Sequence, residues 1–446
     1  MIESVNVTPV HCTAMSKPQL PTTLAPRLPA GSRRDIGTGQ VDQYLEAIIP
    51  RIADKCAASL VPSPIAILLT GSFARGEQSV LLNDGCLHVM GDMEFMVLCP
   101  PEANLDSMQS QLSRSSEELG CWLKGCGVHC KLEFNAVPPK YLRNLQPHIF
   151  GHELVRHGRV VWGREDVLSG PQRFQFSPIP FWDAWRMLNN RLLEQLLWID
   201  ALTRLDDKLL QSVFYQIVKC YIDIGTTLLI FGRRYQPTYA TRASELLRWA
   251  NEKRTVSFLP ILSERVMACT EFKLVPNLRK RTLGVRLDSS AEELRTDVTK
   301  MLLDLIPLAR EVWRWEAIQF SHMEYLPPVS DISLWDGILR LQPRVEKLRG
   351  WAKLMLTPDV RSQRNFVGRM RALLFRGSPR YLTYTVASEL FFSLPVVLAG
   401  ADPQLEVYEP LVPVEFDEHA NEARTWWRLR ANVLSGWKLF LRDHWA

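Results

Sequence analysis

The first third of the chain contains short apolar runs separated by polar segments, a pattern typical of the strands of a small sheet. The run IAILLTG ends at Gly71, and runs of this length are too short for buried helices. We expect strands at residues 65–71, 92–98, 127–137 and, at an edge, 159–163, and helices at 41–60, 103–123 and 152–158. The first helix should be interrupted at Pro50, because proline lacks the amide hydrogen that a helix interior needs. A polar insertion at 81–89 contains Asn-Asp-Gly, a hairpin signal.

From about residue 175 the apolar spacing becomes that of amphipathic helices, and strand signals become rare. Helical stretches are expected at 181–204, 208–232, 241–252, 292–319, 332–355, 361–376 and 383–399. The predicted fold class is therefore α+β, a small mixed sheet followed by a large, mainly α-helical region. With the Leu326-Pro327-Pro328 stretch as a further boundary, four segments follow: a flexible, proline-rich tail at 1–38, a sheet domain at 39–170, a helical domain at 171–328 and a C-terminal helical domain at 329–446.

Composition places the chain among ordinary globular proteins. Hydrophobic residues make up 46% and charged residues 23%, and the net charge of +5 over 446 residues does not by itself require a nucleic-acid partner. The most apolar stretches, 213–231 and 385–400, both contain charged residues, so no membrane span is expected. Nine cysteines in a long chain favour reduced thiols and a cytoplasmic location.

Candidate chemistry is concentrated between residues 71 and 133. Gly71-Ser72 ends a predicted strand and begins a predicted helix, where a phosphate can approach the backbone. Asp92 and Glu94 lie two apart on the next strand, so both carboxylates point to one face. Glu133 lies on a third strand and joins them if the strands are neighbours. Such carboxylates are the hard oxygen ligands that Mg²⁺ prefers.

The order of these features resembles the nucleotidyltransferase superfamily, which includes DNA polymerase beta-like enzymes and aminoglycoside and minimal nucleotidyltransferases. The family pattern is a strand, a Gly-Ser turn, a helix, a strand with Asp-x-Asp or Asp-x-Glu, and then a third acidic residue. The matching segments are GSFARGE at 71–77 and DME at 92–94, and the resemblance extends over residues 63–137. This sequence departs from the family in its longer spacing between Ser72 and Asp92, and in having Glu rather than the more usual Asp as the third acid.

The resemblance implies the transfer of a nucleoside monophosphate from an NTP, with ATP expected, to a hydroxyl of a small molecule or sugar, with release of pyrophosphate. It also implies a bound Mg²⁺ or Mn²⁺ ion. The residues that the resemblance assigns are Asp92, Glu94 and Glu133 as metal ligands and catalytic residues, and Gly71, Ser72 and Arg75 as nucleotide contacts.

Simpler interpretations of these residues stay open. Asp92 and Glu94 could form the solvated face of an edge strand, and Glu133 could be an ion-pair partner of Lys131. Arg75 could tie its helix to Glu77 or to a later carboxylate rather than bind phosphate.

Two groups in the helical region could also belong to a site. Lys219 and Asp223 lie one turn apart on a predicted helix, and a turn with Tyr235, Tyr239 and Arg242 follows. Together these residues could line a nucleotide or acceptor pocket, although a turn beside a solvated ion pair is an equal alternative.

Residues 343–380 contain ten Lys or Arg and only two acidic residues. A solvated helix face is the usual explanation, and a nucleic acid or another anionic partner stays open without being favoured. Other function classes also remain. One is a non-catalytic nucleotide-binding or interaction protein on the same fold, and another is a protein- or RNA-nucleotidylating enzyme.

Overall fold

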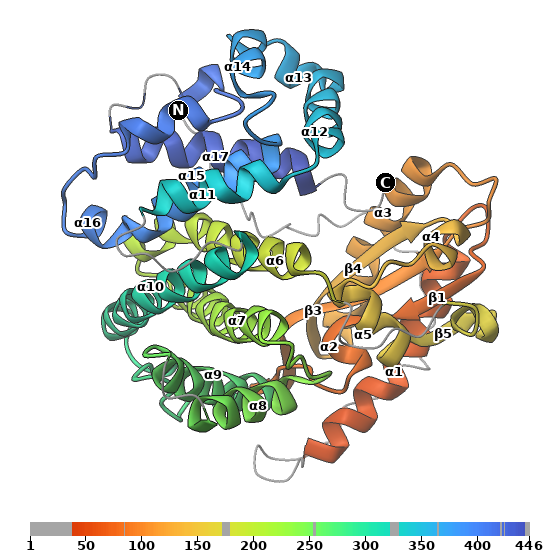
Figure 1. Ribbon diagram of the computed structural model, residues 1–446. Helices are drawn as coiled ribbons and strands as arrows, with labels where there is room; N and C mark the ends of the chain where they lie inside the picture. Colours follow the sequence, from red (N-terminus) through yellow and green to blue (C-terminus); the bar gives the residue numbers. More distant parts are fainter. Residues whose placement is uncertain are drawn as a thin grey trace.

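The computed structural model describes residues 38–83, 85–171, 179–252, 256–321, 330–363, 365–419, 422 and 424–441. It confirms the α+β class: a small sheet near the N-terminus lies beside a large helical region (Figure 1). The predicted tail up to residue 37, the turn residue Asp84 and the predicted boundary at 326–328 lie outside the described residues.

A five-stranded mixed sheet is built around one long central strand. The strands are β1 (Ala66–Leu69), β2 (Val80–Asn83), β3 (Cys86–Leu98), β4 (Val128–Val137) and β5 (Arg159–Gly163). β3 pairs in parallel with β4 and antiparallel with β1 and β2, and β1 pairs antiparallel with β5. β5 therefore lies at an edge, as the sequence predicted.

The two faces of the sheet follow the alternation of the strand residues. Met93, Phe95 and Val97 belong to a buried cluster with residues of α1 (Thr38–Ala58) and α3 (Leu105–Gly125). Met96 and Leu98 belong to a smaller cluster on the opposite side, where α4 (Pro139–Arg143) and α5 (Ile149–His157) pack. Since side chains alternate along a strand, even-numbered residues of β3 all face away from α1 and α3.

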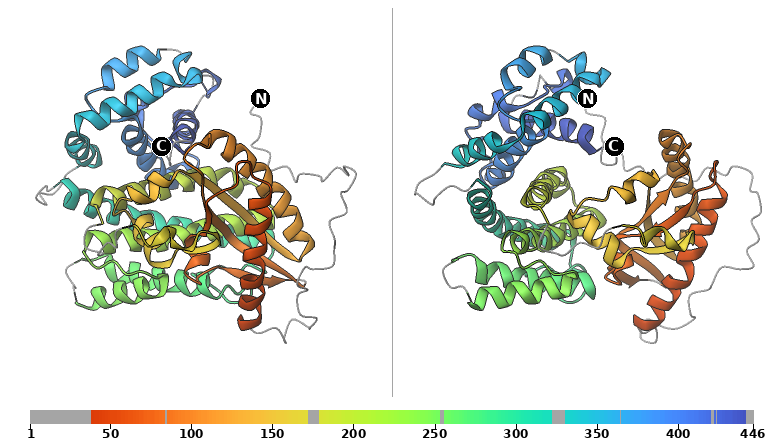
Figure 2. Two further views of the ribbon diagram at one scale, coloured as in Figure 1. Left: turned by 90° about the vertical axis from the view of Figure 1, so that its right-hand side faces the viewer. Right: turned by 45° about the vertical axis from the view of Figure 1, so that its right-hand side comes forward.

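The helical region packs around one continuous cluster of buried apolar side chains that extends from Ile179 to Trp437 and includes residues of both predicted helical domains. Figure 2 shows these helices stacked beside the sheet. The helices are α6 (Phe181–Leu197), α7 (Asp207–Phe231), α8 (Tyr239–Glu252), α9 (Leu259–Leu274), α10 (Ala291–Ser321), α11 (Asp331–Leu341), α12 (Arg344–Leu356), α13 (Pro358–Arg361), α14 (Phe366–Leu373), α15 (Pro379–Phe392), α16 (Leu394–Leu398) and α17 (Thr425–Leu441). Short 3-10 turns occur at Glu165–Leu168, Ile199–Thr203, Glu406–Leu411 and Asp417–His419.

α7 is the central helix of this region, packed against α6, α8, α9 and α10. It is the one described helix that is long and apolar enough to cross a membrane by length and composition, but 89% of its apolar window is buried inside the protein. Its apolar character is therefore accounted for by its place in the core.

The predicted interruption of the first helix at Pro50 is wrong, because α1 continues through that residue. Ile48, Ile49 and Ile52 on either side of the proline are almost completely buried against the sheet. Burying each such side chain is worth about 2 kcal/mol, which outweighs the roughly 3 kcal/mol cost of proline in a helix interior.

Other helices differ from the sequence prediction. The stretch predicted at 332–355 divides at Pro343 into α11 and α12, and α9 and α17 were not predicted. α9 carries polar Ser263, Thr270 and Lys273 on its buried face, which obscures the apolar pattern. α17 does show buried residues at helical spacing, from Trp426 onward, so its signal was present in the sequence.

A buried polar contact joins the sheet to the helical region. The Ser79 hydroxyl, which precedes β2, donates to the Lys273 carbonyl at 2.6 Å, and the Lys273 ammonium donates to the Ser79 and Tyr215 oxygens at 3.1 and 3.0 Å. Burial lowers the pKa of Lys273, so this ammonium depends on its hydrogen-bond partners. The contact therefore fixes α7, through Tyr215, and α9, through Lys273, against the start of β2.

Candidate functional site

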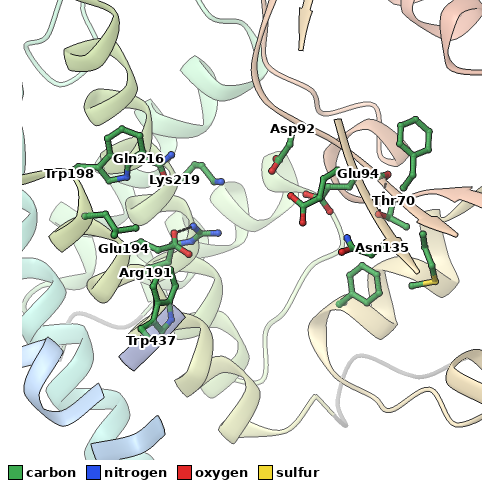
Figure 3. Close-up of a pocket in the computed structure, with 15 residues that line it drawn as sticks. Thr70, Asp92, Glu94, Asn135, Arg191, Glu194, Trp198, Gln216, Lys219 and Trp437 are labelled. Carbon is green, nitrogen blue, oxygen red and sulfur yellow. Dashed lines mark hydrogen bonds and ion pairs between the residues drawn. The ribbon is translucent and has the colours of Figure 1, made fainter. Parts of the chain in front are cut away.

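The three carboxylates named from the sequence come together on one face of the sheet. Glu94 of β3 and Glu133 of β4 are direct register partners in a parallel pair, and Asp92 lies opposite Lys131. The apolar neighbours Met93, Phe95, Leu132 and Phe134 pack on the other face. Asp92, Glu94 and Glu133 therefore project away from α1 and α3, toward the helical region, as Figure 3 shows for Asp92 and Glu94.

The glycine turn lies directly against Glu94. Gly71 adopts φ +64°, and a Cβ added there would lie 2.7 Å from Oε2 and 3.0 Å from Oε1 of the Glu94 carboxylate. The amide of Thr70 donates to the Glu94 carbonyl at 2.9 Å, which holds this turn against β3. A residue with a side chain at position 71 would displace the carboxylate, so glycine is required both by conformation and by space.

The negative charges influence one another strongly. Burial, together with the nearby Asp92 and Glu133 carboxylates, raises the pKa of Glu94 to about 7. Burial also acts to raise the pKa of Asp92, but Lys219, Lys131, a backbone hydrogen bond and the Glu133 side chain lower it, and the net shift is downward. The site thus keeps Asp92 ionised beside a Glu94 that titrates near neutral pH.

Opposite the carboxylates lies a wall built from the helical region. A cavity of about 450 Å³ separates the two walls, and Figure 3 shows Lys219 directed across it toward Asp92. Arg191 on the same wall is ion-paired with Asp223 and Glu194. The lining residues are Thr70, Asp92, Glu94, Phe95, Met96, Glu133, Asn135, Phe150, Arg191, Glu194, Leu197, Trp198, Gln216, Lys219 and Trp437.

The structure places Arg75 away from the cavity lining. Its guanidinium donates to Glu77 at 3.0 Å and to Glu153 of α5 at 2.6 Å, with only 3% of the side chain exposed. Burial acts to lower the pKa of Arg75, but Glu153, Tyr239 and Glu77 raise it well above its usual value, so the ion pair is firmly charged. This arrangement favours the structural interpretation of Arg75 over phosphate binding.

Ser72 does not contribute to the cavity lining either. The helix predicted to begin at Gly71-Ser72 is present as α2 (Gly71–Ala74), but it has only four residues. A single turn adds little of the dipole that favours anions at helix ends, so the predicted phosphate contact at Ser72 would depend on local backbone amides alone.

The turn after α7 also contributes to structure rather than to the cavity. Arg242 donates to Glu153 at 2.6 Å and to the Gln236 carbonyl at 2.7 Å, and the Tyr235 hydroxyl donates to Glu153 at 3.2 Å. Burial acts to raise the pKa of Glu153, but Arg75 and Arg242 lower it, and the net shift is downward. Glu153 on α5 is therefore the carboxylate shared by Arg75, which directly follows α2, and Arg242 on α8, and this buried network joins the three helices.

Sequence reasoning missed several residues of the cavity. Asn135 could have been found, since it lies two positions after Glu133 on the same strand face. Trp198, Gln216 and Trp437 could not, because they lie just after α6, on α7 and on α17, and the approach of these separate helices to the sheet is set by tertiary packing. Glu133 satisfies both of its proposed interpretations: it lines the cavity and lies 3.7 Å from Lys131 Nζ.

The described residues contain no group of three or more His, Cys, Asp and Glu side chains that is already arranged to hold a metal ion. The donor chemistry of the three site carboxylates nevertheless suits a hard divalent cation. Burial, and after it the nearby Asp92 and Glu133 carboxylates, raise the pKa of Glu94, and a bound cation would favour its ionised form. Asp92, Glu94 and Glu133 are thus the residues that would hold Mg²⁺ or Mn²⁺.

Comparisons with models of known protein families, with curated proteins and with solved structures found no match to this chain.

Proposed function

We propose that the protein is a metal-dependent nucleotidyltransferase that transfers a nucleoside monophosphate from an NTP, with ATP expected, to a hydroxyl of a small molecule or sugar. The observation that carries the proposal is the convergence of Asp92, Glu94 and Glu133 from two parallel strands beside Gly71, with Lys219 facing them across one cavity. Carboxylates that hold a divalent cation, opposite a cationic side chain, would suit a polyphosphate whose charge must be both neutralised and positioned.

The chain order of the site also supports the proposal. A strand (β1), a glycine-serine turn, an acidic strand (β3) and a second acidic strand (β4) follow one another in the order implied by the resemblance to nucleotidyltransferases. The polar insertion that lengthens the spacing between Ser72 and Asp92 forms β2 and the start of β3, a paired extension of the sheet. The longer spacing is therefore compatible with the same arrangement.

In the proposed reaction, the acceptor oxygen forms a bond to the α-phosphorus of the NTP. The bond from that phosphorus to the oxygen bridging to the β-phosphate breaks, and pyrophosphate leaves with the bonding electron pair. Both Glu133 and Lys219 line the cavity, and in this proposal Glu133 would accept the proton of the attacking hydroxyl while Lys219 would hold the phosphate chain by its charge. When bound at the carboxylates, Mg²⁺ or Mn²⁺ supplies positive charge that stabilises the reacting phosphate.

The test is incubation of the purified protein with labelled NTPs, Mg²⁺ and a cell extract, comparing wild type with Asp92→Asn. The variant should lose metal-dependent transfer at least about a hundredfold, since a carboxylate that acts on the reacting phosphate is typically worth several kcal/mol. Glu117→Gln, on the exposed side of α3, is the charge-matched control and should retain activity. Equal turnover by wild type and Asp92→Asn would overturn the assignment, and label on protein or RNA would replace the small-molecule acceptor.

Lys219 can be tested separately by measuring NTP binding. Lys219→Gln should weaken NTP binding about tenfold, because a charge-assisted contact to phosphate is worth about 1.5–3 kcal/mol. Lys208→Gln, exposed on the first turn of the same helix, is the matched control. NTP binding without any transfer in wild type would instead support the non-catalytic nucleotide-binding alternative.

A further inference from the structure

A second feature of the molecule lies far along the chain from the cavity. Among the described residues, sixteen large hydrophobic side chains are exposed, and seven of them fall between Leu341 and Phe375. The most exposed of these seven are Leu356 at 83% and Phe375 at 73%. Such a concentration of exposed apolar side chains marks an interaction surface in a protein whose other apolar residues are largely buried.

Helix α12 has two apolar faces rather than one. Its buried face consists of Lys347, Trp351 and Leu354, which are spaced four and three residues apart. A second stripe, Val345, Leu348, Ala352 and Leu356, repeats at intervals of three and four residues and is exposed along its whole length. Since residues at this spacing lie on one side of a helix, the stripe forms a continuous apolar strip that no other described element covers.

The neighbouring segment is fixed beside α12 by buried contacts. The rings of Trp351 and Phe366 lie 6.3 Å apart, and the Trp351 indole donates to the Gly377 carbonyl at 3.0 Å. The Lys347 ammonium donates to the carbonyls of Phe375 and Arg376 at 3.1 and 3.2 Å. The backbone of residues 375–377 is therefore held close to α12, and the exposed Phe375 side chain belongs to this neighbouring segment.

Basic side chains surround this strip. Arg344, Arg349, Lys353, Arg361 and Arg371 are all exposed on α12, α13 and α14. Residues 343–380 contain only two acidic residues, Glu346 and Asp359, and both are exposed. Exposed apolar residues flanked by lysine and arginine form the pattern of a helix that lies in a membrane interface.

We propose that α12, α13 and α14 form a docking surface for an anionic membrane, on which the protein lies without crossing it. The basic side chains would contact lipid phosphates, and Val345, Leu348, Leu356 and Phe375 would enter the boundary of the acyl chains. A nucleic acid would use the same charges but not the apolar strip. The surface contributes no residue to the cavity, and Figure 1 places these helices along an outer edge of the molecule, so both can act at the same time.

Sedimentation with lipid vesicles tests this proposal directly. The full chain should bind vesicles that contain phosphatidylglycerol and should not bind vesicles of phosphatidylcholine alone, and added salt should weaken the binding. Arg349→Gln and Lys353→Gln should each lower the partition coefficient about fivefold, which corresponds to about 1 kcal/mol per basic side chain at the surface.

The apolar strip has its own variants and control. Leu348→Asp and Phe375→Ser should abolish most binding, whereas Val275→Asp, at a residue with 67% exposure that follows α9, should bind like wild type. Circular dichroism shows whether each variant is folded, and the two strip variants lie on different segments, so a misfolded variant leaves the other as the test. No binding to anionic vesicles, equal loss in the Val275 control, or binding to RNA but not to vesicles would each overturn the proposal.

Discussion

Replacing Glu94 with glutamine should stabilise the metal-free protein at alkaline pH. Glutamine keeps the shape of the side chain but removes a charge that burial disfavours most and that Asp92 and Glu133 also oppose. The pKa of Glu94 rises from 4.5 to about 7 on folding. At 1.36 kcal/mol for each pKa unit, this rise means that ionising Glu94 costs at most ~3 kcal/mol more in the folded protein than in the unfolded chain.

The sign follows from proton linkage. The folded protein binds the Glu94 proton more tightly than the unfolded chain does, so this group's contribution to stability is fully present below about pH 4.5. It is lost as the pH rises toward 7, and above that pH the ionised carboxylate remains a cost. Glu94→Gln should therefore be up to about 3 kcal/mol more stable than wild type near pH 8, and the difference should shrink to a few tenths of a kcal/mol near pH 4.5.

Urea denaturation at several pH values, with a chelator present, measures this difference. Mg²⁺ added near pH 8 should stabilise wild type and have little effect on Glu94→Gln, because binding to the folded state alone raises stability. The variant should also lose transfer activity. Equal stability of the two proteins near pH 8, or a difference that does not change with pH, would refute the view that burial and the neighbouring carboxylates disfavour the ionised form of Glu94.

Two further predictions concern the structure around the carboxylates. Gly71→Ala should reduce nucleotide transfer at least tenfold, because the added Cβ would lie within 3.0 Å of the Glu94 carboxylate. The control is Gly76→Ala, which is also at positive φ (+69°) but has nothing within 4 Å of an added Cβ. It should carry a similar backbone cost of about 1 kcal/mol and retain activity in the same assay. Glu153→Gln should lower the free energy of unfolding by about 3 kcal/mol in urea denaturation, because it removes the carboxylate charge that the buried Arg75 and Arg242 share. Glu46→Gln, in an exposed ion pair with Arg159, should cost less than about 1 kcal/mol, and equal effects of the two substitutions would contradict the role of burial.

The local pattern of the sequence was enough to predict most of the sheet. Strand β5 was predicted with the bounds that the structure shows, and β3 and β4 were found because their apolar and polar residues alternate. The same period of two placed Asp92 and Glu94 on one face. These predictions succeed because side-chain direction in a strand is fixed by the backbone, whatever the strand packs against.

Contacts between distant parts of the chain were not encoded in any local pattern. That Glu94 pairs with Glu133, that Arg75 is taken up by Glu153, and that Trp437 reaches the cavity all depend on how separate elements pack. Pro50 stays inside α1 for the same reason, since buried isoleucines outweigh a local preference. The sequence thus determined which residues carry charge and which face they take, and the tertiary structure decided their partners, because burial and Coulomb interactions act through space rather than along the chain.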